Sequence, residues 1–345
     1  MSAISAHDRA IVRWLLICLL LIFAMVILGG ATRLTGSGLS MTDWHPIHGI
    51  VPPLTERDWE EEFGNYQQSP EFQKINRDMD VSGFKSIFWF EYSHRMLGRL
   101  IGLVFLLPFL YFWWRGRIRP GLTPKLIVMF VLGGMQGLLG WYMVKSGLVS
   151  NPHVSQYRLS AHLIAAILIY GFILWTMLDL AGDHRYRALA DSRRRGWRLA
   201  SLGLTVLLLV TIVSGGFVAG LDAGLIFNTF PKMGEEWVPQ GLGALTPWYL
   251  NLFENKVTVQ FDHRVLAITT GVLLLAWYWK GRAAFEQNDV TRSFKLVGMM
   301  VIIQVGLGIG TLLLQVPVWL GVAHQGGALL LFTVLLMNVH ALSRG

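Results

Sequence analysis

The stretch "FEYSHRMLGRLIGLVFLLPFLYFWW" (residues 90–114) decides the fold class. Its apolar part is long enough to cross a bilayer as a helix, yet it begins with a carboxylate, a histidine and two arginines. Ionisable groups at membrane depth are costly, and their default interpretation is functional. A second stretch, "QFDHRVLAITTGVLLLAWYW" (260–279), repeats the pattern. We therefore expect a membrane protein with functional polar groups at one end of its helices.

The composition of the whole chain agrees with this interpretation. Of its 345 residues, 53% are hydrophobic and only 14% are charged, which is typical of a polytopic membrane protein. Eight apolar stretches are each long enough to span a bilayer: 14–31, 92–114, 125–144, 159–182, 198–220, 262–279, 294–316 and 318–340. The predicted fold class is an all-α polytopic membrane protein with eight transmembrane helices. The single cysteine, Cys18, excludes an internal disulfide and a thiolate metal site.

The distribution of charge predicts the orientation in the membrane. The N-terminus and the segments after the second, fourth, sixth and eighth stretches hold more than half of the 29 Lys and Arg, but few of the 21 acids. The positive-inside rule places both termini in the cytoplasm, and a bacterial inner membrane is the predicted location. This bias explains the net charge of +8, so no nucleic-acid partner is needed.

The two halves of the chain resemble one another. "VILGGATRLTGSGLS" parallels "TIVSGGFVAGLDAGL", "EYSHRMLGRLIG" parallels "QFDHRVLAITTG", "QGLLG" parallels "QVGLG", and "SAHLIAA" parallels "VAHQGGA". The matches occur in the same order, which predicts a parallel repeat of two homologous four-helix bundles. We place the N-terminal bundle at 1–182 with a long outer loop at 31–91, a cytoplasmic linker at 183–197, and the C-terminal bundle at 198–345.

Four histidines recur at matched positions of the two halves, at the start of even-numbered apolar stretches. Two imidazoles from different helices at one level of a bundle are the arrangement that holds a haem from both faces. A transition-metal site is a weaker alternative, because no carboxylate repeats at ligand spacing in both halves. These candidate iron ligands are His94 and His162 in the first half and His263 and His324 in the second; the other six histidines lack the pattern.

Two arginines adjoin these histidines. Arg95 and Arg264 each follow a candidate ligand directly, and arginine suits carboxylates, so both are candidate contacts for haem propionates. The glycines of "GGATRLTGSGLS" either form tight turns or allow close approach of a ligand. The sequence does not separate these two roles.

One acidic residue breaks the symmetry. Glu91 lies one helical turn before His94, whereas the residue three before His263 is Gln260. A carboxylate beside one haem and an amide beside the other suggests chemistry in the N-terminal half and a permanent prosthetic group in the C-terminal half. The alternative is an acid that favours a helix N-terminus, and it stays open.

The outer segment contains "TERDWEEEF", in which "TERD" predicts a capping box at a helix start. With its aromatic residues this segment either covers the outer face as a lid or is a solvated acidic spacer.

Long motifs make the chain similar to the haem A synthase family, most of all to its alphaproteobacterial and mitochondrial branch. They include "GGATRLTGSGLSMTDWHP", "FEYSHRMLGRLIGL", "QGLLGWYMVKSGL", "GGFVAGLDAGLIFNTFPKMG", "QFDHRVLAIT" and "GVAHQGGALLL", and the resemblance covers about residues 10–340. It implies an eight-helix protein of two homologous bundles. Some bacterial members carry a cysteine pair in each outer loop, which this chain lacks, so a thiol relay does not apply.

The resemblance also implies an activity and a set of site residues. The reaction is oxidation of the C8 methyl of haem O to a formyl group, which gives haem A for cytochrome c oxidase. His263 and His324 are then axial ligands of a resident haem b, His94 and His162 flank the substrate haem, and Glu91 is catalytic. The implied partners are haem O, haem A, haem O synthase, oxidase assembly factors, an electron donor of unknown identity, membrane lipids and a second copy in a homo-oligomer.

Two other function classes compete with this one. A bis-histidine dihaem cytochrome that transfers electrons from quinol would use the same four histidines, but it does not account for the difference between Glu91 and Gln260. A transporter would show inverted repeats and broken helices near the membrane midplane, and neither is evident.

Overall fold

The computed structural model describes residues 6–42, 48–148, 152–182, 191–285 and 289–343. Within these ranges it has no strand, and eight helices are long and apolar enough to cross a membrane, which confirms the predicted fold class. They are α1 (Ala6–Leu34), α4 (Val81–Trp114), α5 (Leu122–Gly147), α6 (Gln156–Ala181), α7 (Asp191–Gly220), α9 (Lys256–Ala284), α10 (Asp289–Leu313) and α11 (Val318–Ser343).

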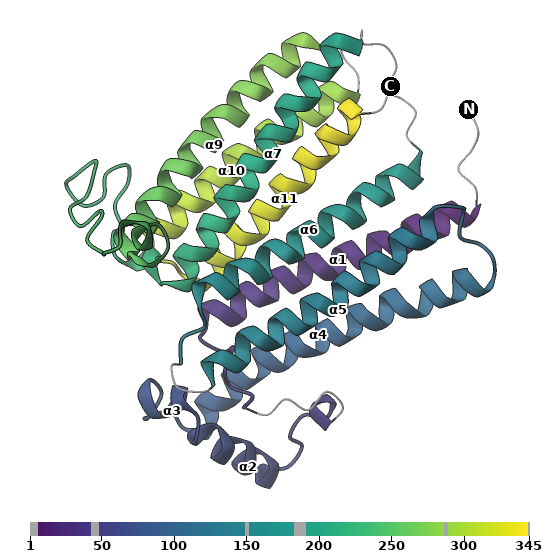
Figure 1. The fold of residues 1–345 in the computed structure, drawn as a ribbon. Helices are drawn as coiled ribbons and strands as arrows, with labels where there is room; N and C mark the ends of the chain where they lie inside the picture. The colour runs from purple at the N-terminus through teal and green to yellow at the C-terminus, as the bar shows by residue number, and fades with distance from the viewer. Residues whose placement is uncertain (1–5, 43–47, 149–151, 183–190, 286–288, 344–345) are drawn as a thin grey trace.

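The eight long helices lie in two groups (Figure 1). One group contains α1, α4, α5 and α6, and the other contains α7, α9, α10 and α11; α1 and α6 lie against α7 and α11 between the groups. The first turn of α1 and the last turn of α11 lie at the same end of the molecule. This arrangement agrees with the repeat in the sequence, and the domain boundaries stay a prediction.

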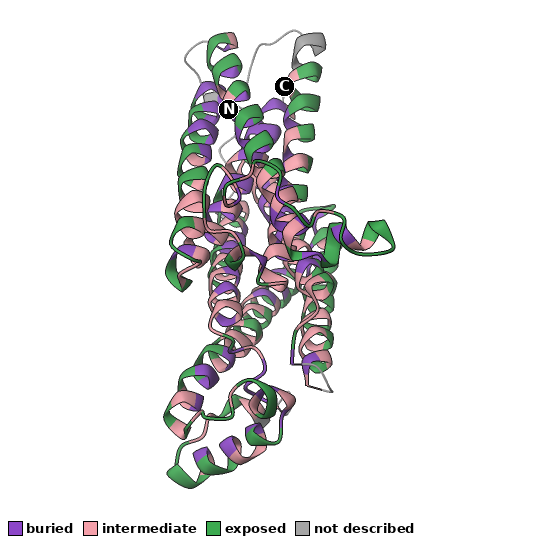
Figure 2. Cartoon of the chain, turned by 90° about the vertical axis from the view of Figure 1, so that its left-hand side faces the viewer, coloured by how far each residue is buried: buried purple, intermediate pink, exposed green. Residues whose placement is uncertain are grey.

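Small residues allow the two groups of helices to approach closely. A Cβ added at Gly216 of α7 would lie 2.6 Å from the Ser160 Oγ of α6, and one at Gly326 of α11 would lie 2.5 Å from the Ile27 Cδ1 of α1. Packing through glycine is the usual way in which membrane helices gain van der Waals contact. Figure 2 shows buried positions on the inner faces of the long helices and exposed positions outside. Large apolar residues such as Leu103 and Leu107 are exposed on the outer faces, as is expected of residues that face lipid.

Helix α4 begins earlier than the apolar pattern predicts. Asp80 caps it, with its carboxylate accepting a hydrogen bond of 2.8 Å from the Gly83 N–H, so the helix already includes residues 81–91. Helix α1 continues to Leu34, so the helices on either side reach into the predicted outer segment 31–91, whose bounds stay a prediction. His94 consequently lies well inside α4, whereas the hydropathy pattern alone placed it at the start of a helix.

The outer segment after α1 forms a small helical unit that packs on the early turns of α4. Its described helices are η1 (His48–Ile50), α2 (Glu56–Gln67) and α3 (Pro70–Lys74). Thr55 and Asp58 make the predicted capping box at the start of α2. The rings of Trp59 on α2 and Phe88 on α4 meet edge to face at 5.0 Å. The outer segment therefore packs on α4 through aromatic residues and is not a solvated spacer. In the second half the corresponding segment contains η2 (Ala223–Leu225), η3 (Trp248–Leu250) and α8 (Asn251–Glu254).

Candidate functional site

Each of the four candidate ligands faces a glycine on a neighbouring helix. A Cβ added at these glycines would lie between 2.8 and 3.2 Å from the nearest atom of the imidazole, closer than side chains ordinarily pack. The pairs are His94 with Gly29, His162 with Gly140, His263 with Gly215, and His324 with Gly308. Gly29 belongs to "GGATRLTGSGLS", and Gly36 in the same motif has a positive φ of 65°, so close approach and tight turn both occur there.

Within each half the two imidazoles lie close together. His94 of α4 and His162 of α6 are near enough to interact electrostatically, and so are His263 of α9 and His324 of α11. All four side chains are half-buried. Two imidazoles from different helices can bind the opposite faces of a haem iron, which is the donor set that the sequence predicts.

A matched glutamine lies beside one histidine of each pair. The Gln136 amide of α5 donates to the His162 carbonyl at 2.8 Å, and the Gln304 amide of α10 donates to the His324 carbonyl at 3.0 Å. The Oε1 atoms of both glutamines are buried without a hydrogen-bond partner among the described residues, and so is His162 Nδ1. At His324 the Gln304 Nε2 also lies 3.1 Å from the ring Nδ1. At His162 both Nδ1 and the Gln136 Oε1 lack a partner, and a bond from an Nδ1–H to that Oε1 would leave Nε2 for iron, which fits a haem ligand.

The tautomer of His263 follows from its hydrogen bonds. Its Nδ1 lies 2.8 Å from the Ser214 Oγ, and that hydroxyl donates its only proton to the Thr211 carbonyl at 2.7 Å. Ser214 must therefore accept from the Nδ1–H, which leaves Nε2 unprotonated, the form that binds iron. The residue at the position of Ser214 in the first half is Leu28, which cannot make this bond.

The facing glycines provide a direct test of the ligand assignment. We expect Gly308→Ala to displace the imidazole of His324 and to lower the haem b content of the purified protein by at least half, because the new Cβ would lie 2.8 Å from its Cε1. Gly306→Ala on the same helix is the control, since its Cβ would meet nothing within 4 Å. Haem is measured by the absorbance of the pyridine complex. Equal haem content in the two variants would contradict the assignment.

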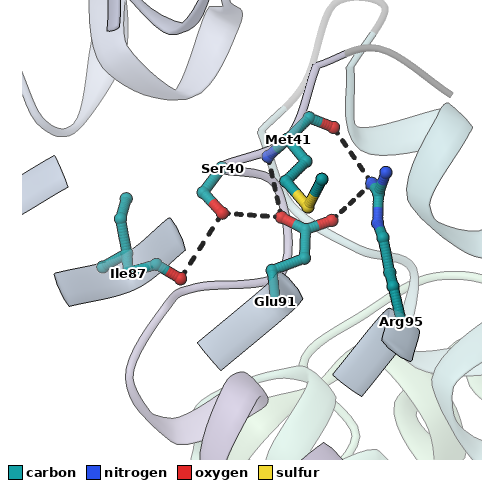
Figure 3. A network of polar contacts seen from close by, with 5 residues as sticks. All are labelled: Ser40, Met41, Ile87, Glu91 and Arg95. Carbon is teal, nitrogen blue, oxygen red and sulfur yellow. Dashed lines mark hydrogen bonds and ion pairs between the residues drawn. The ribbon is translucent and has the colours of Figure 1, made fainter. Parts of the chain in front are cut away.

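Glu91 is held by three hydrogen bonds (Figure 3). Its Oε2 accepts from the Ser40 hydroxyl at 2.7 Å and from the Met41 backbone N–H at 2.8 Å, and its Oε1 accepts from the Arg95 guanidinium at 2.5 Å. The residue is 3% exposed. These contacts join α4 to the segment that follows α1, and they show that Glu91 is no solvated acid at the start of a helix.

The second half repeats this geometry without the carboxylate. When Gly29 and Gly215, which face His94 and His263, are aligned, Met41 of the first half corresponds to Phe227 of the second. Glu91 accepts from the Met41 N–H, whereas the Gln260 amide donates to the Phe227 carbonyl at 3.0 Å. Gln260 is as buried as Glu91, at 2% exposed. The two halves thus place an anion and a neutral amide at the same point.

The two arginines also occupy equivalent positions. Arg95 donates to the Met41 carbonyl at 3.0 Å, and Arg264 donates to the Phe227 carbonyl at 2.7 Å. Both therefore anchor the segment that follows the first helix of their half. The Arg264 Nε is buried without a partner among the described residues. Contacts between these arginines and haem propionates stay a prediction.

A second buried acid lies near Glu91 in the outer unit. Glu71 of α3 is 6% exposed and accepts a hydrogen bond of 3.1 Å from the Tyr66 hydroxyl. Burial raises the pKa of the Glu71 carboxyl to about 7, and the charge of Glu91 adds to the increase. The sequence predictions did not include Glu71, Ser40, Ser214 or the two glutamines. Only the glutamines carried a signal, because they open the repeated "QGLLG" and "QVGLG" motifs.

Two other histidines that the structure describes lie apart from the candidate site. His340 lies 3.1 Å from the Asp179 carboxylate and packs edge-on against Trp175, while His153 is exposed. His45 and His184 lie outside the described residues. Among the described residues no group of three or more His, Cys, Asp or Glu side chains is placed to hold a metal ion.

These features define a class: a polytopic helical membrane protein with two matched pairs of histidines, in which Glu91 of the N-terminal half takes the position that Gln260 has in the C-terminal half. The COX15-CtaA family model, described as cytochrome oxidase assembly protein, matches residues 12–336. The chain belongs to this family, which confirms the resemblance stated above.

Three relatives illustrate the similarity. "Heme A synthase" of Nitrosospira multiformis is 49% identical over 339 residues, which cover 98% of this chain and 95% of the relative. "Heme A synthase" of Paramagnetospirillum magneticum is 50% identical over 344 residues, 99% of this chain and 95% of the relative. "Heme A synthase COX15" of Homo sapiens is 45% identical over 346 residues, 99% of this chain and 84% of the relative. The similarity thus extends over nearly the whole chain in bacterial and animal proteins.

Proposed function

We propose that this protein is a haem A synthase, an oxidoreductase that converts the C8 methyl of haem O into the formyl group of haem A. The observation that carries the proposal is the pair of equivalent sites with Glu91 in one and Gln260 in the other, at the same place relative to the backbone of Met41 and Phe227. Two sites with one purpose would need no such difference. The names of the relatives, given over nearly the full length of the chain, support the same reaction.

The proposal assigns a different haem to each half. His94 and His162 would hold the substrate haem O, and His263 and His324 would hold a resident haem b through their imidazoles. The support for the second assignment is the Ser214 bond, which keeps His263 in the ligand tautomer. When bound, haem b would supply a one-electron redox centre. Each haem would then belong to one of the two bundles that the sequence repeat predicts, 1–182 and 198–345.

Glu91 provides the chemistry that the second half lacks. Oxidation of a methyl to a formyl group removes hydrogen from the reacting carbon, so a group that takes up protons is needed near that carbon. The Glu91 carboxylate also stabilises positive charge that develops on the substrate, and such stabilisation is strong at a site of low dielectric constant. Ser40, Met41 and Arg95 hold the carboxylate in place for both tasks.

The competing function is electron transfer from quinol through two bis-histidine haems, and a buried glutamate in one half alone does not favour it. We further propose that the protein is in a bacterial inner membrane with both termini in the cytoplasm, and that it serves the assembly of cytochrome oxidase. The first turn of α1 and the last turn of α11 lie at the same end of the molecule, which supports placing both termini on one side of the membrane.

Product analysis tests the proposed function. Membranes that contain this protein and a source of haem O should yield haem A on extraction, identified by chromatography and by the mass of the formyl product. Membranes with the haem O source alone are the control and should yield haem O only. Haem O without haem A in both samples would reject the proposal and leave the electron-transfer cytochrome as the better explanation.

A further inference from the structure

A cavity of about 210 Å³ adjoins the catalytic carboxylate of the N-terminal half. Its wall includes Met41 and Arg95. The Met41 backbone N–H donates to Glu91 and Arg95 forms an ion pair with it (Figure 3). Trp141 and Lys145 of α5 line it as well. Its volume is below the ~300–1,000 Å³ of sites that enclose a whole drug-sized ligand, so it fits a polar arm of a ligand.

Two residues of the cavity wall adjoin the N-terminal histidine pair along the chain. Arg95 directly follows His94 in α4, and Trp141 directly follows Gly140, whose backbone packs against the His162 ring. A flat ligand held between His94 and His162 would therefore have its edge near this cavity.

Lys145 is the distinctive cation of the cavity. Its ammonium lies 4.9 Å from the centre of the Trp141 ring, a cation–π contact that keeps it at the wall. Arg95 is balanced by Glu91, but no carboxylate among the described residues pairs with Lys145. The charge at this wall therefore attracts an anion.

The second half has no equivalent of this cation. In the sequence repeat that aligns Gln136 with Gln304, Trp141 corresponds to Ile309 and Lys145 corresponds to Leu313. Leu313 is 47% exposed and apolar. The cation, like Glu91, is thus confined to the half that we assign to the substrate.

We propose that Lys145, with Arg95 and Trp141, forms a carboxylate-binding subsite that holds a propionate of the substrate porphyrin. The inference rests on the proposed function, because it takes haem O as the ligand between His94 and His162. An ammonium is a compact point charge that binds a carboxylate oxygen without fixing the plane of the group, which suits a flexible propionate arm. The bond orients the ring edge relative to Glu91, so Lys145 is a positioning residue for the reaction.

Optical titration of the haem b-loaded protein with haem O and with haem O dimethyl ester tests this subsite. The ester keeps the ring and the tail but removes both carboxylates. We expect Lys145→Leu to weaken binding of haem O about tenfold, the effect of a lost hydrogen bond to a charged group, and to leave binding of the ester unchanged. Lys125→Leu, at the opposite end of α5, is the matched control and should change neither affinity.

The outcomes separate the competing explanations. Equal weakening of haem O and ester, or no weakening of either, would overturn the proposal. Membrane phosphates share the anionic chemistry, so the titrations are repeated in nanodiscs of phosphatidylcholine and of phosphatidylglycerol. An effect of Lys145→Leu that appears only with phosphatidylglycerol would assign the cation to lipid and also overturn the proposal. Lys145-dependent binding of haem O without any haem A product would instead reject the proposed function and leave the subsite standing.

Discussion

Glu91→Gln is expected to lower the rate of haem A formation by about 10²–10⁴-fold, the usual range for loss of a catalytic acid or base. Glutamine has the same size and keeps an oxygen that can accept from Ser40 and the Met41 N–H. It cannot take up a proton or balance Arg95. The variant should therefore retain both haems while it fails to convert haem O. The rate is measured from the ratio of haem A to haem O in timed extracts.

Glu71→Gln is the matched control for this prediction. Glu71 is a second buried glutamate in the same outer region, but the Tyr66 hydroxyl of the outer unit is its hydrogen-bond partner. Its replacement should leave haem A formation within about twofold of the unchanged protein, because glutamine keeps an oxygen that accepts from Tyr66 and the contacts of Glu91 with Ser40, Met41 and Arg95 are unchanged. A Glu91→Gln variant that carries both haems and turns over at the normal rate would remove Glu91 from the mechanism.

His263→Ala is expected to abolish the spectrum of the resident haem b. The imidazole is the group that the Ser214 bond holds in the ligand tautomer, and alanine offers no donor to iron. His94→Ala should have the opposite selectivity: the haem b spectrum remains, and binding of added haem O is lost. The measurement is the reduced-minus-oxidised difference spectrum of each purified variant, followed by titration with haem O.

His153→Ala controls for general damage, because His153 is exposed and lies outside both pairs. It should keep both the haem b spectrum and haem O binding. If His263→Ala retained a bis-histidine haem b spectrum while His94→Ala lost it, the assignment of the two halves would be reversed. If both retained it, neither pair would be the ligand set.

The sequence predicted the positions of the membrane-spanning helices but not the start of α4. Hydropathy located all eight spans, because a helix that meets lipid must be apolar along its own length. It failed at the start of α4, where Asp80 caps the helix and Phe84 and Phe88 pack on the outer unit, since this packing depends on residues of α2 that are distant in the chain.

The family, the fold class and the four histidines were accessible from the sequence alone. The histidines became visible because the chain repeats itself, and a repeat can be read by comparing a sequence with itself. The difference between Glu91 and Gln260 was visible for the same reason. All of these are properties of single positions or of short local patterns.

Only the tertiary structure decided what surrounds those positions. It brings Ser40 and Met41 onto a carboxylate 51 and 50 residues away along the chain, and it places a glycine of another helix against each imidazole. It also sets Lys145 of α5 in the same cavity wall as Arg95 of α4. Contacts of this kind depend on how separate helices pack, and no local pattern of residues encodes the distance between two helices.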